Sequence, residues 1–242
     1  MTNPSSLPHH TTTSGKQKQN PHYHGHRERL RQRFLDGNPD ALPDYELLEL
    51  LLFYAIPRRD VKILSKSLIK RFGSFAGVLA ASPERLMELD GVKQTTVGLI
   101  KAVQVSGLRL ARAEVIDQVV MSSWDKLIDY CRAGLAQEKT ERFQVLYLNS
   151  KNALMADEVH QQGTVDHTPV YPREIIKRAL ELGATALIMV HNHPSGDATP
   201  SRADIDMTRE VRDAATKLSI TLHDHLIVTR SGYSSFKEMG IL

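Results

Sequence analysis

Cysteine is almost absent from this sequence, which has one, Cys131, among 242 residues. A single cysteine excludes an intramolecular disulfide, and such cysteine usage is typical of a reducing compartment. The chain also lacks a Pro-Cys-x-x-Cys segment, which disfavours a zinc deaminase. Because Cys131 lies in an amphipathic helical pattern, we expect it to be a small packing residue rather than a nucleophile.

Long apolar runs are absent as well. No stretch approaches 18 uninterrupted apolar residues, and the N-terminus lacks the apolar core of a signal peptide. We therefore expect a cytoplasmic protein with no membrane partner. Apolar residues make up 41% of the chain and charged residues 24%, which is the composition of an ordinary globular protein long enough for one large or two modest domains.

The charge is unevenly distributed, although its net value is only +3. Residues 1–115 contain 17 Lys and Arg against 11 Asp and Glu, whereas residues 116–242 contain 14 against 17. A basic N-terminal half suits contact with DNA or another acidic partner. A solvated helical face rich in Lys and Arg explains the same excess equally well, so both interpretations stay open.

Composition and periodicity divide the chain into three parts. Residues 1–25 are polar, and we expect a disordered tail because they cannot bury enough apolar surface to offset chain entropy. Residues 26–114 follow a helical pattern and predict an all-α domain. Residues 115–242 mix strands and helices, which predicts a central sheet with helices packed on it.

The expected elements follow from apolar periodicity and from the residues that end it. In the helical part we expect helices over 45–56, 61–72, 75–80 and 83–89, followed by a long helix that ends near residue 113. In the mixed part we expect helices over 122–136 and 173–182 and from residue 201, a hairpin of strands 142–148 and 153–160, and strands over 185–190 and 220–228.

The most informative segment is His191-x-His193, followed by Ser201 and Asp204 in the pattern His-x-His-x7-Ser-x2-Asp. Two imidazoles and a carboxylate are three ligands of a catalytic Zn²⁺ and leave one position for water. Residues 185–190 predict a buried strand, so His191 and His193 emerge from its end on one face. Ser201 would be the N-cap of the next helix, with Asp204 in its first turn. The pattern therefore predicts a zinc site formed by His191, His193 and Asp204.

Other interpretations of these residues are weaker. Ser-x-x-Asp is by itself a helix-capping arrangement, so Ser201 and Asp204 alone would indicate only a helix start. A serine nucleophile is possible in principle, but no Gly-x-Ser-x-Gly segment precedes a helix here. All four residues at this spacing, beside a buried strand, favour the metal site.

Residues 191–204, His-Asn-His-Pro-Ser-Gly-Asp-x-x-Pro-Ser-x-x-Asp, resemble the JAMM motif of the JAB/MPN zinc metallopeptidases, in the form found in RadC-like (UPF0758) proteins. The resemblance covers about residues 25 to 242. It implies an MPN-type α/β fold related in architecture to cytidine deaminases, and a zinc-dependent metallopeptidase or isopeptidase. The segments that carry it beyond the metal loop are residues 25–31, 44–56, 171–175 and 222–228.

The resemblance also implies catalytic roles. JAMM enzymes use a glutamate upstream of the histidine pair, at the start of a strand, as the general base. Glu141 matches that position because it follows the first helix of the mixed part and precedes a predicted strand, while Glu138 and Glu158 are the alternatives. The hydroxyl of Ser201, beside the metal, would donate to the oxyanion of the reaction, and this role is compatible with helix capping.

Two further features leave alternatives open. Leu86-x-x-Leu89-x-Gly91 resembles a helix-hairpin-helix element, which holds a DNA phosphate by backbone amides, but Lys93 stands where a second glycine is expected. Asp224 and His225 either support the metal ligands or form a structural hydrogen-bonded pair. The alternative function is therefore a DNA-binding or DNA-repair-associated protein with a structural metal, or a zinc nuclease. The sequence specifies no substrate.

Overall fold

The structure, a computed structural model, describes residues 22–37, 41–162 and 170–242. Most of the expected tail, residues 1–21, lies outside the described residues, whereas residues 22–25 form the first turn of a helix. The chain divides into two compact units between Ser65 and Lys66. No helix in the described ranges is long and apolar enough to cross a membrane.

The first unit is held together by Arg27, a member of the basic segment near the N-terminus. Its buried guanidinium donates hydrogen bonds to the backbone carbonyls of Phe53 at 3.2 Å, Ile56 at 2.7 Å and Arg59 at 2.5 Å. These carbonyls lie at and beyond the end of the second helix, where backbone acceptors lack helical partners. The helices are α1 (His22–Asp36), α2 (Asp44–Ala55) and the start of α3 (Lys62–Phe72).

The second unit begins with short helices and a long one, α4 (Phe75–Ala80), α5 (Pro83–Met87) and α6 (Gln94–Ala113). Gly91 lies in the turn between α5 and α6 and has a φ of 92°, a left-handed conformation that favours glycine. The compact units divide at residue 65, and Ala111 of α6 packs against the core of the sheet, while the domain boundary expected at residue 114 stays a prediction. Separate folding of residues 26–114 stays a prediction.

A five-stranded mixed sheet with strand order β2-β1-β3-β4-β5 forms the centre of this unit. Strand β1 pairs antiparallel with β2 and β3, β3 pairs parallel with β4, and β4 pairs antiparallel with β5. The expected α/β class with a preceding helical region is confirmed. The strands are β1 (Arg142–Leu148), β2 (Leu154–Gln162), β3 (Ala186–Asn192), β4 (Thr221–Val228) and β5 (Tyr233–Ser235), and a 3-10 turn covers Val120–Ser122.

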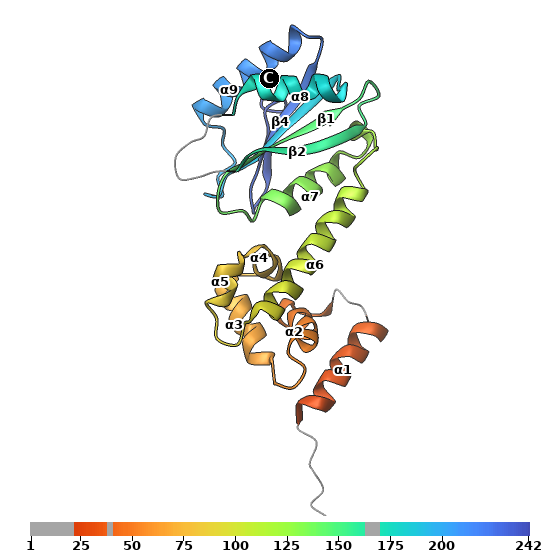
Figure 1. Cartoon of the computed structure of the whole chain (residues 1–242), viewed down its shortest axis with the longest axis vertical. Coiled ribbons are helices and arrows are strands. Elements are labelled where there is room, and N and C mark those ends of the chain that lie inside the picture. The colour runs from red at the N-terminus through yellow and green to blue at the C-terminus, as the bar shows by residue number, and fades with distance from the viewer. Residues whose placement is uncertain (1–21, 38–40, 163–169) are drawn as a thin grey trace, which may run out of the picture. The chain divides into compact units, whose positions relative to one another are not determined.

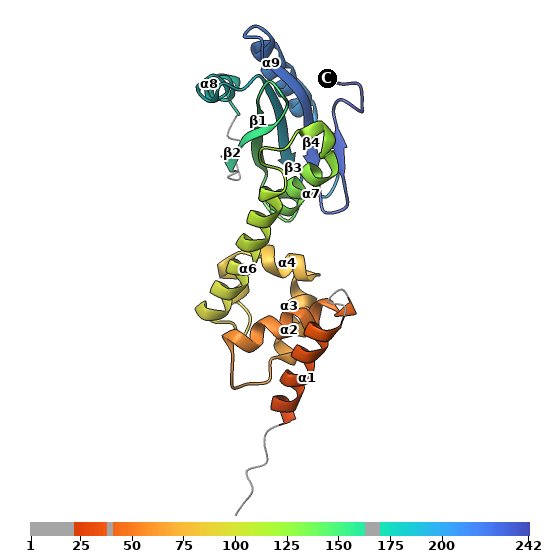
Figure 2. The same ribbon diagram turned by 90° about the vertical axis from the view of Figure 1, so that its right-hand side faces the viewer.

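Helices cover both faces of the sheet, with α7 on one side and α8 and α9 on the other (Figure 1), as the turned view also shows (Figure 2). In β3, Ile188 and Val190 pack on the α7 side, while Leu187 and Met189 pack on the side of α8 and α9. This alternation explains why the strand is apolar throughout and buried along its whole length. The helices are α7 (Trp124–Leu135), α8 (Pro172–Leu182) and α9 (Arg202–Thr216).

Candidate metal centre

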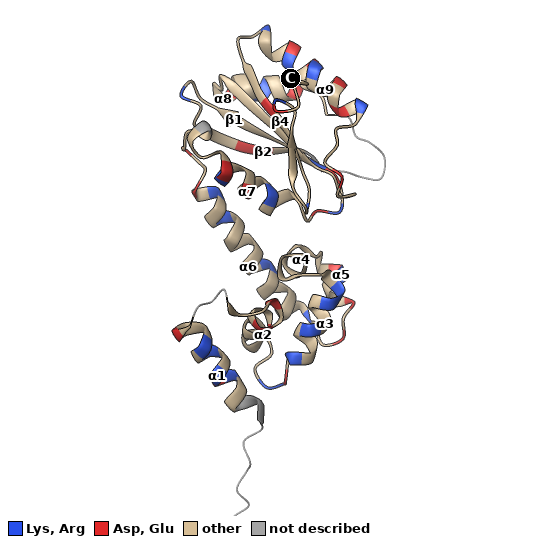
Figure 3. Cartoon of the chain, turned by 180° about the vertical axis from the view of Figure 1, so that it is seen from behind, with Lys and Arg blue, Asp and Glu red and all other residues tan. Residues whose placement is uncertain are grey.

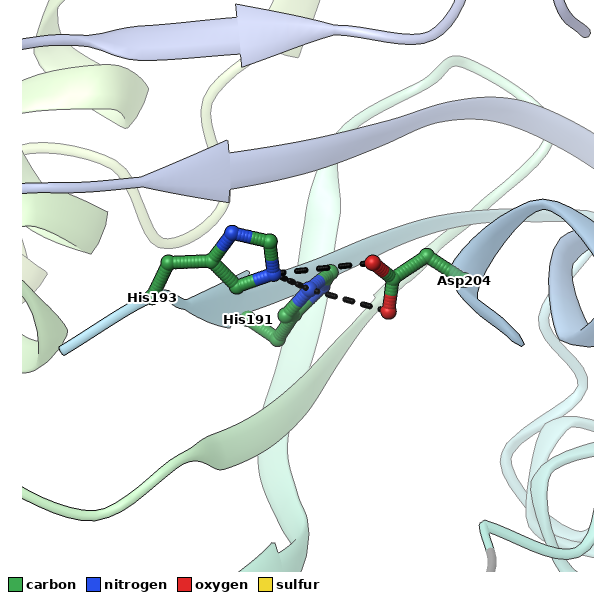
Figure 4. A group of neighbouring side chains, drawn as sticks. All are labelled: His191, His193 and Asp204. Carbon is green, nitrogen blue, oxygen red and sulfur yellow. Dashed lines mark hydrogen bonds and ion pairs between the residues drawn. The ribbon is translucent and has the colours of Figure 1, made fainter. Parts of the chain in front are cut away.

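Three side chains at the end of β3 and the start of α9 point at one another (Figure 4). The Nε2 atoms of His191 and His193 lie 3.0 Å apart. Asp204 places Oδ1 3.3 Å from Nε2 of His191 and Oδ2 3.5 Å from Nε2 of His193. The structure thus brings together the two histidines and the carboxylate that the sequence pattern predicted as ligands, and this group could hold a metal ion.

The position of Asp204 follows from the way α9 begins. Ser201 is the N-cap, and its Oγ accepts a hydrogen bond from the backbone N–H of Asp204 at 3.1 Å. In return, Oδ2 of Asp204 accepts from the backbone N–H of Ser201 at 2.7 Å. This reciprocal pair fixes the carboxylate at the helix start, because it satisfies two N–H groups that have no helical partner.

A chain of hydrogen bonds behind His191 determines which of its nitrogens carries the proton. The hydroxyl of Thr208 lies 2.5 Å from the backbone carbonyl oxygen of Asp204. Because a carbonyl oxygen can only accept, the hydroxyl donates its proton to this hydrogen bond. Thr208 must then accept from Nδ1 of His225 at 2.6 Å, which leaves Nε2 of neutral His225 to accept from Nδ1 of His191 at 2.8 Å. The Nε2 atom of His191 therefore carries a lone pair.

His193 is oriented in the same sense by the loop that follows it. Its Nδ1 donates to the backbone carbonyl of Asp197 at 2.8 Å, so Nε2 of the neutral imidazole is also a lone pair. Two lone pairs and a carboxylate facing one another repel unless a cation lies between them. Their separations match the edge of about 3.3 Å expected for ligands arranged tetrahedrally around Zn²⁺ at about 2.0–2.1 Å.

Burial and hydrogen bonds shift the pKa values of Asp204, His193 and His225. Burial opposes ionisation of Asp204, but its hydrogen bonds with Ser201 and with the protonated forms of His191 and His193 outweigh burial and hold the pKa of the carboxyl well below its usual range. The protonated form of His193 donates a hydrogen bond to Asp204, which stabilises that form and raises the pKa of His193. Burial lowers the pKa of His225 well below its ordinary value, so His225 is neutral, as the hydrogen-bond chain requires.

Among the glutamates considered as the base, Glu141 lies on the side of the metal centre. Phe143 pairs with His191 across β1 and β3, and Glu141 precedes Phe143 by two residues, just before β1 begins. The negative charge of Glu141 accordingly contributes to the raised pKa of His193.

The other two glutamates are already engaged with arginines. Glu138 forms an ion pair with Arg142 at 3.1 Å. Glu158 lies in β2 and is held by Arg178 of α8 at 2.7 Å, and hydrogen bonds from Arg178 lower its pKa. The geometry therefore favours Glu141 among the three, although it is an exposed residue just before the strand.

Sequence reasoning predicted the convergence of His191, His193 and Asp204 but missed Thr208 and left His225 undecided. Asp224 does not contact the ligands, because its carboxylate accepts hydrogen bonds from Ser235 and from the backbone N–H of Lys237. The signal for Thr208 was present. It is a polar residue on the buried face of α9, one turn after Asp204, where an apolar residue would be expected.

Comparison with known proteins agrees with this geometry. Residues 121–241 match the model of the RadC-like JAB domain family. The chain is also 56% identical over 217 residues to UPF0758 protein SPO0054 of Ruegeria pomeroyi, covering 90% of this chain and 97% of that protein. The chain belongs to the RadC-like JAB domain family. The matched region of this RadC-like protein contains the sheet, α7 to α9 and the whole candidate metal centre, and the name of the relative states no activity.

Proposed function

We propose that this RadC-like protein is a zinc-dependent hydrolase that cleaves an amide bond, as a metallopeptidase or an isopeptidase. The observation that carries this proposal is the convergence of two imidazole lone pairs and the Asp204 carboxylate beside Glu141. The proposal is supported by the match to the RadC-like JAB domain family and by the resemblance of residues 191–204 to the JAMM motif, and the donor set suits Zn²⁺ with an open coordination position.

Each residue of the centre has a distinct task in this proposal. When bound, the ion would supply a polarised water and a Lewis acid for the substrate carbonyl. Glu141 takes the proton of the attacking water and later passes it to the leaving amine. The Ser201 hydroxyl accepts from the N–H of Asp204, which leaves its own proton to donate to the oxyanion. His225 and Thr208 hold His191 in the ligand tautomer.

The test is the Glu141→Gln variant, which keeps the size and polarity of the side chain but cannot act as a base. We expect hydrolysis of amide-linked substrates, screened as peptides and isopeptides, to fall by about 10²–10⁴-fold while bound zinc is unchanged. Glu138→Gln and Glu158→Gln are matched controls that should retain most activity. Full activity in Glu141→Gln would refute this assignment of the base.

The alternative function is nucleic-acid binding with a structural metal, or hydrolysis of a phosphodiester at the same centre. Its support is the basic N-terminal half of the chain. The same proteins separate these possibilities. Retention of DNA that falls with salt, but persists in Glu141→Gln and after chelation, indicates binding alone. Cleavage of DNA that is lost in both conditions indicates a nuclease.

A further inference from the structure

A basic cavity of about 630 Å³ has Pro194, which directly follows His193, in its lining. All its lining residues belong to the unit formed by residues 66–242. It is formed by the ends of α3 to α5, by the segment before β1, by Pro194 and by Arg230 after β4. Its volume is within the range of sites that hold small ligands.

Positive charge dominates the lining. Five cationic side chains, those of Arg71, Arg85, Lys139, Arg142 and Arg230, face one carboxylate, that of Glu138. Bands of Lys and Arg also mark the ribbon of α3 and α5 (Figure 3).

Two of these cations have acidic partners and three do not. Arg142 pairs with Glu138 at 3.1 Å and Arg71 with Glu88 at 3.0 Å. The other three cations are Arg85, Lys139 and Arg230. Within the described ranges, none of them forms an ion pair with a carboxylate.

The other positive charges of the lining act on Lys139. Desolvation lowers the pKa of Lys139, and the positive charges of Arg85, Arg230 and Arg71 lower it further, against the opposite effect of Glu88. The Nε atom of Arg142 is buried and has no hydrogen-bond partner among the described residues. An arrangement of like charges around one hollow costs free energy in the empty protein, and a bound anion would remove that cost.

Asn192 connects the cavity to the metal centre. Its side chain, on the α7 side of β3, accepts from the backbone N–H of Arg142 at 2.8 Å and donates to the carbonyls of Glu138 at 3.3 Å and Thr140 at 3.2 Å. The segment that it fixes contributes Lys139 to the cavity and Glu141 to the metal centre. An anion in the cavity would therefore lie against the backbone that positions the proposed base.

We propose that this cavity binds a phosphate ester, that of a nucleotide or of a single-stranded nucleic acid. Arginine predominates in the lining, and its planar guanidinium matches phosphate oxygens by paired hydrogen bonds. Phe72 also lines the cavity, with the guanidinium of Arg85 5.2 Å from its ring centre, and such a pair offers a surface on which a base can stack. The site goes beyond the proposed amide hydrolase and does not require it.

The test measures binding to the full-length protein at low ionic strength. The probe is a fluorescent single-stranded oligonucleotide. Inorganic phosphate, a nucleoside monophosphate and polyglutamate are added as competitors. We expect Lys139→Met and Arg230→Gln each to weaken oligonucleotide binding by about tenfold, because each removes a charged donor. Both side chains are exposed, so the fold should be retained. Lys217→Met, an exposed lysine at the end of α9, is the matched control and should bind as the wild type does.

The competitors distinguish the two sources of the phosphate. If a nucleoside monophosphate displaces the labelled oligonucleotide as well as unlabelled oligonucleotide does, the ligand is a nucleotide. If the affinity grows with strand length, the ligand is a nucleic acid. Both results support the site. The proposal is overturned if polyglutamate competes as well as the oligonucleotide, if no phosphate compound binds, or if the two variants bind as tightly as Lys217→Met. Loss of activity in Glu141→Gln has no bearing on these outcomes.

Discussion

Thr208 decides the proton positions of two histidines without being a metal ligand itself. Its hydroxyl donates to the carbonyl of Asp204, so it can only accept from His225, and His225 can only accept from His191. Every bond in this chain runs in one direction, which leaves Nε2 of His191 ready to bind a cation. The chemistry of the ligand thus depends on a neutral hydroxyl two hydrogen bonds away.

Thr208→Val tests this chain, because valine keeps the shape of threonine and removes the hydroxyl. We expect the affinity for zinc to fall by about 10–100-fold, since His225 is no longer held as an acceptor for His191. Competition with a chromophoric chelator measures it. Thr216→Val is the matched control, because Thr216 makes the same hydrogen bond to a carbonyl within α9 but does not touch the centre. Equal zinc affinity in the two variants would show that the chain has no effect on the ligand.

The first turn of helix α9 contains both a capping box and a side chain of the candidate metal centre. Asp204 is the third residue of the helix, which completes the capping box, and it is also the carboxylate of the candidate metal centre. Its Oδ2 accepts from Ser201 while Oδ1 lies towards His191, so one side chain can perform both tasks. A change that disturbs the helix start should therefore also disturb the metal centre.

The two roles of Ser201 can be separated by substitution. Ser201→Ala removes the cap and the hydroxyl, and we expect a loss of about 1 kcal/mol in the free energy of unfolding together with a loss of hydrolysis. Ser201→Gly should lose only a few tenths of a kcal/mol and still lose the oxyanion donor. Urea denaturation and steady-state kinetics measure the two effects. If activity is high in Ser201→Gly and low in Ser201→Ala, it follows stability alone, and Ser201 has only the capping role.

Most elements of the second unit were predictable because apolar periodicity and their end signals agree. Strand β1 was expected at its observed bounds, and α8 ends at Gly183, which adopts the left-handed conformation with φ of 66°. Strand β5 was missed, since three residues of Tyr233–Ser235 are too few to show a period and depend on pairing with β4.

Within the candidate site, the features that the sequence predicted are those formed by residues close to one another in the chain. The ligands lie within 14 residues of one another and carry a pattern, so the sequence predicted their convergence. The support of His191 by His225 joins neighbouring parallel strands, and this contact depends on a register that composition does not specify. The basic cavity needs α3, α5, the segment before β1 and the loop after β4 together, so no single stretch indicates it.

At the scale of the whole molecule, the family match and the candidate centre both lie in the second unit. Residues 121–241 contain every proposed ligand, the proposed base and the proposed oxyanion donor. The first unit contributes none of them, and its buried Arg27 serves to hold its own helices. Binding of DNA by the basic N-terminal half stays a prediction.

Metal should stabilise the folded chain as a whole. We expect about one zinc per chain by elemental analysis, and removal by a chelator should lower the midpoint of thermal unfolding, because free metal at 100 times its Kd stabilises by about 2.7 kcal/mol. Adding zinc back should restore the midpoint. His193→Ala and Asp204→Ala should lack zinc and show no response to the chelator. A well-folded wild type without metal that also fails to bind added zinc would contradict the proposed centre.

The anchoring of residues 138–142 by Asn192 limits how the chain length can vary here. Because successive side chains in an extended segment alternate, one residue inserted between Glu141 and Arg142 would turn the Glu141 carboxylate away from His193. A second insertion would restore the direction but shift it by about 6.6 Å. In homologues with the same centre, gaps in this connection should therefore fall before Glu138, towards the end of α7, and never between the anchor points.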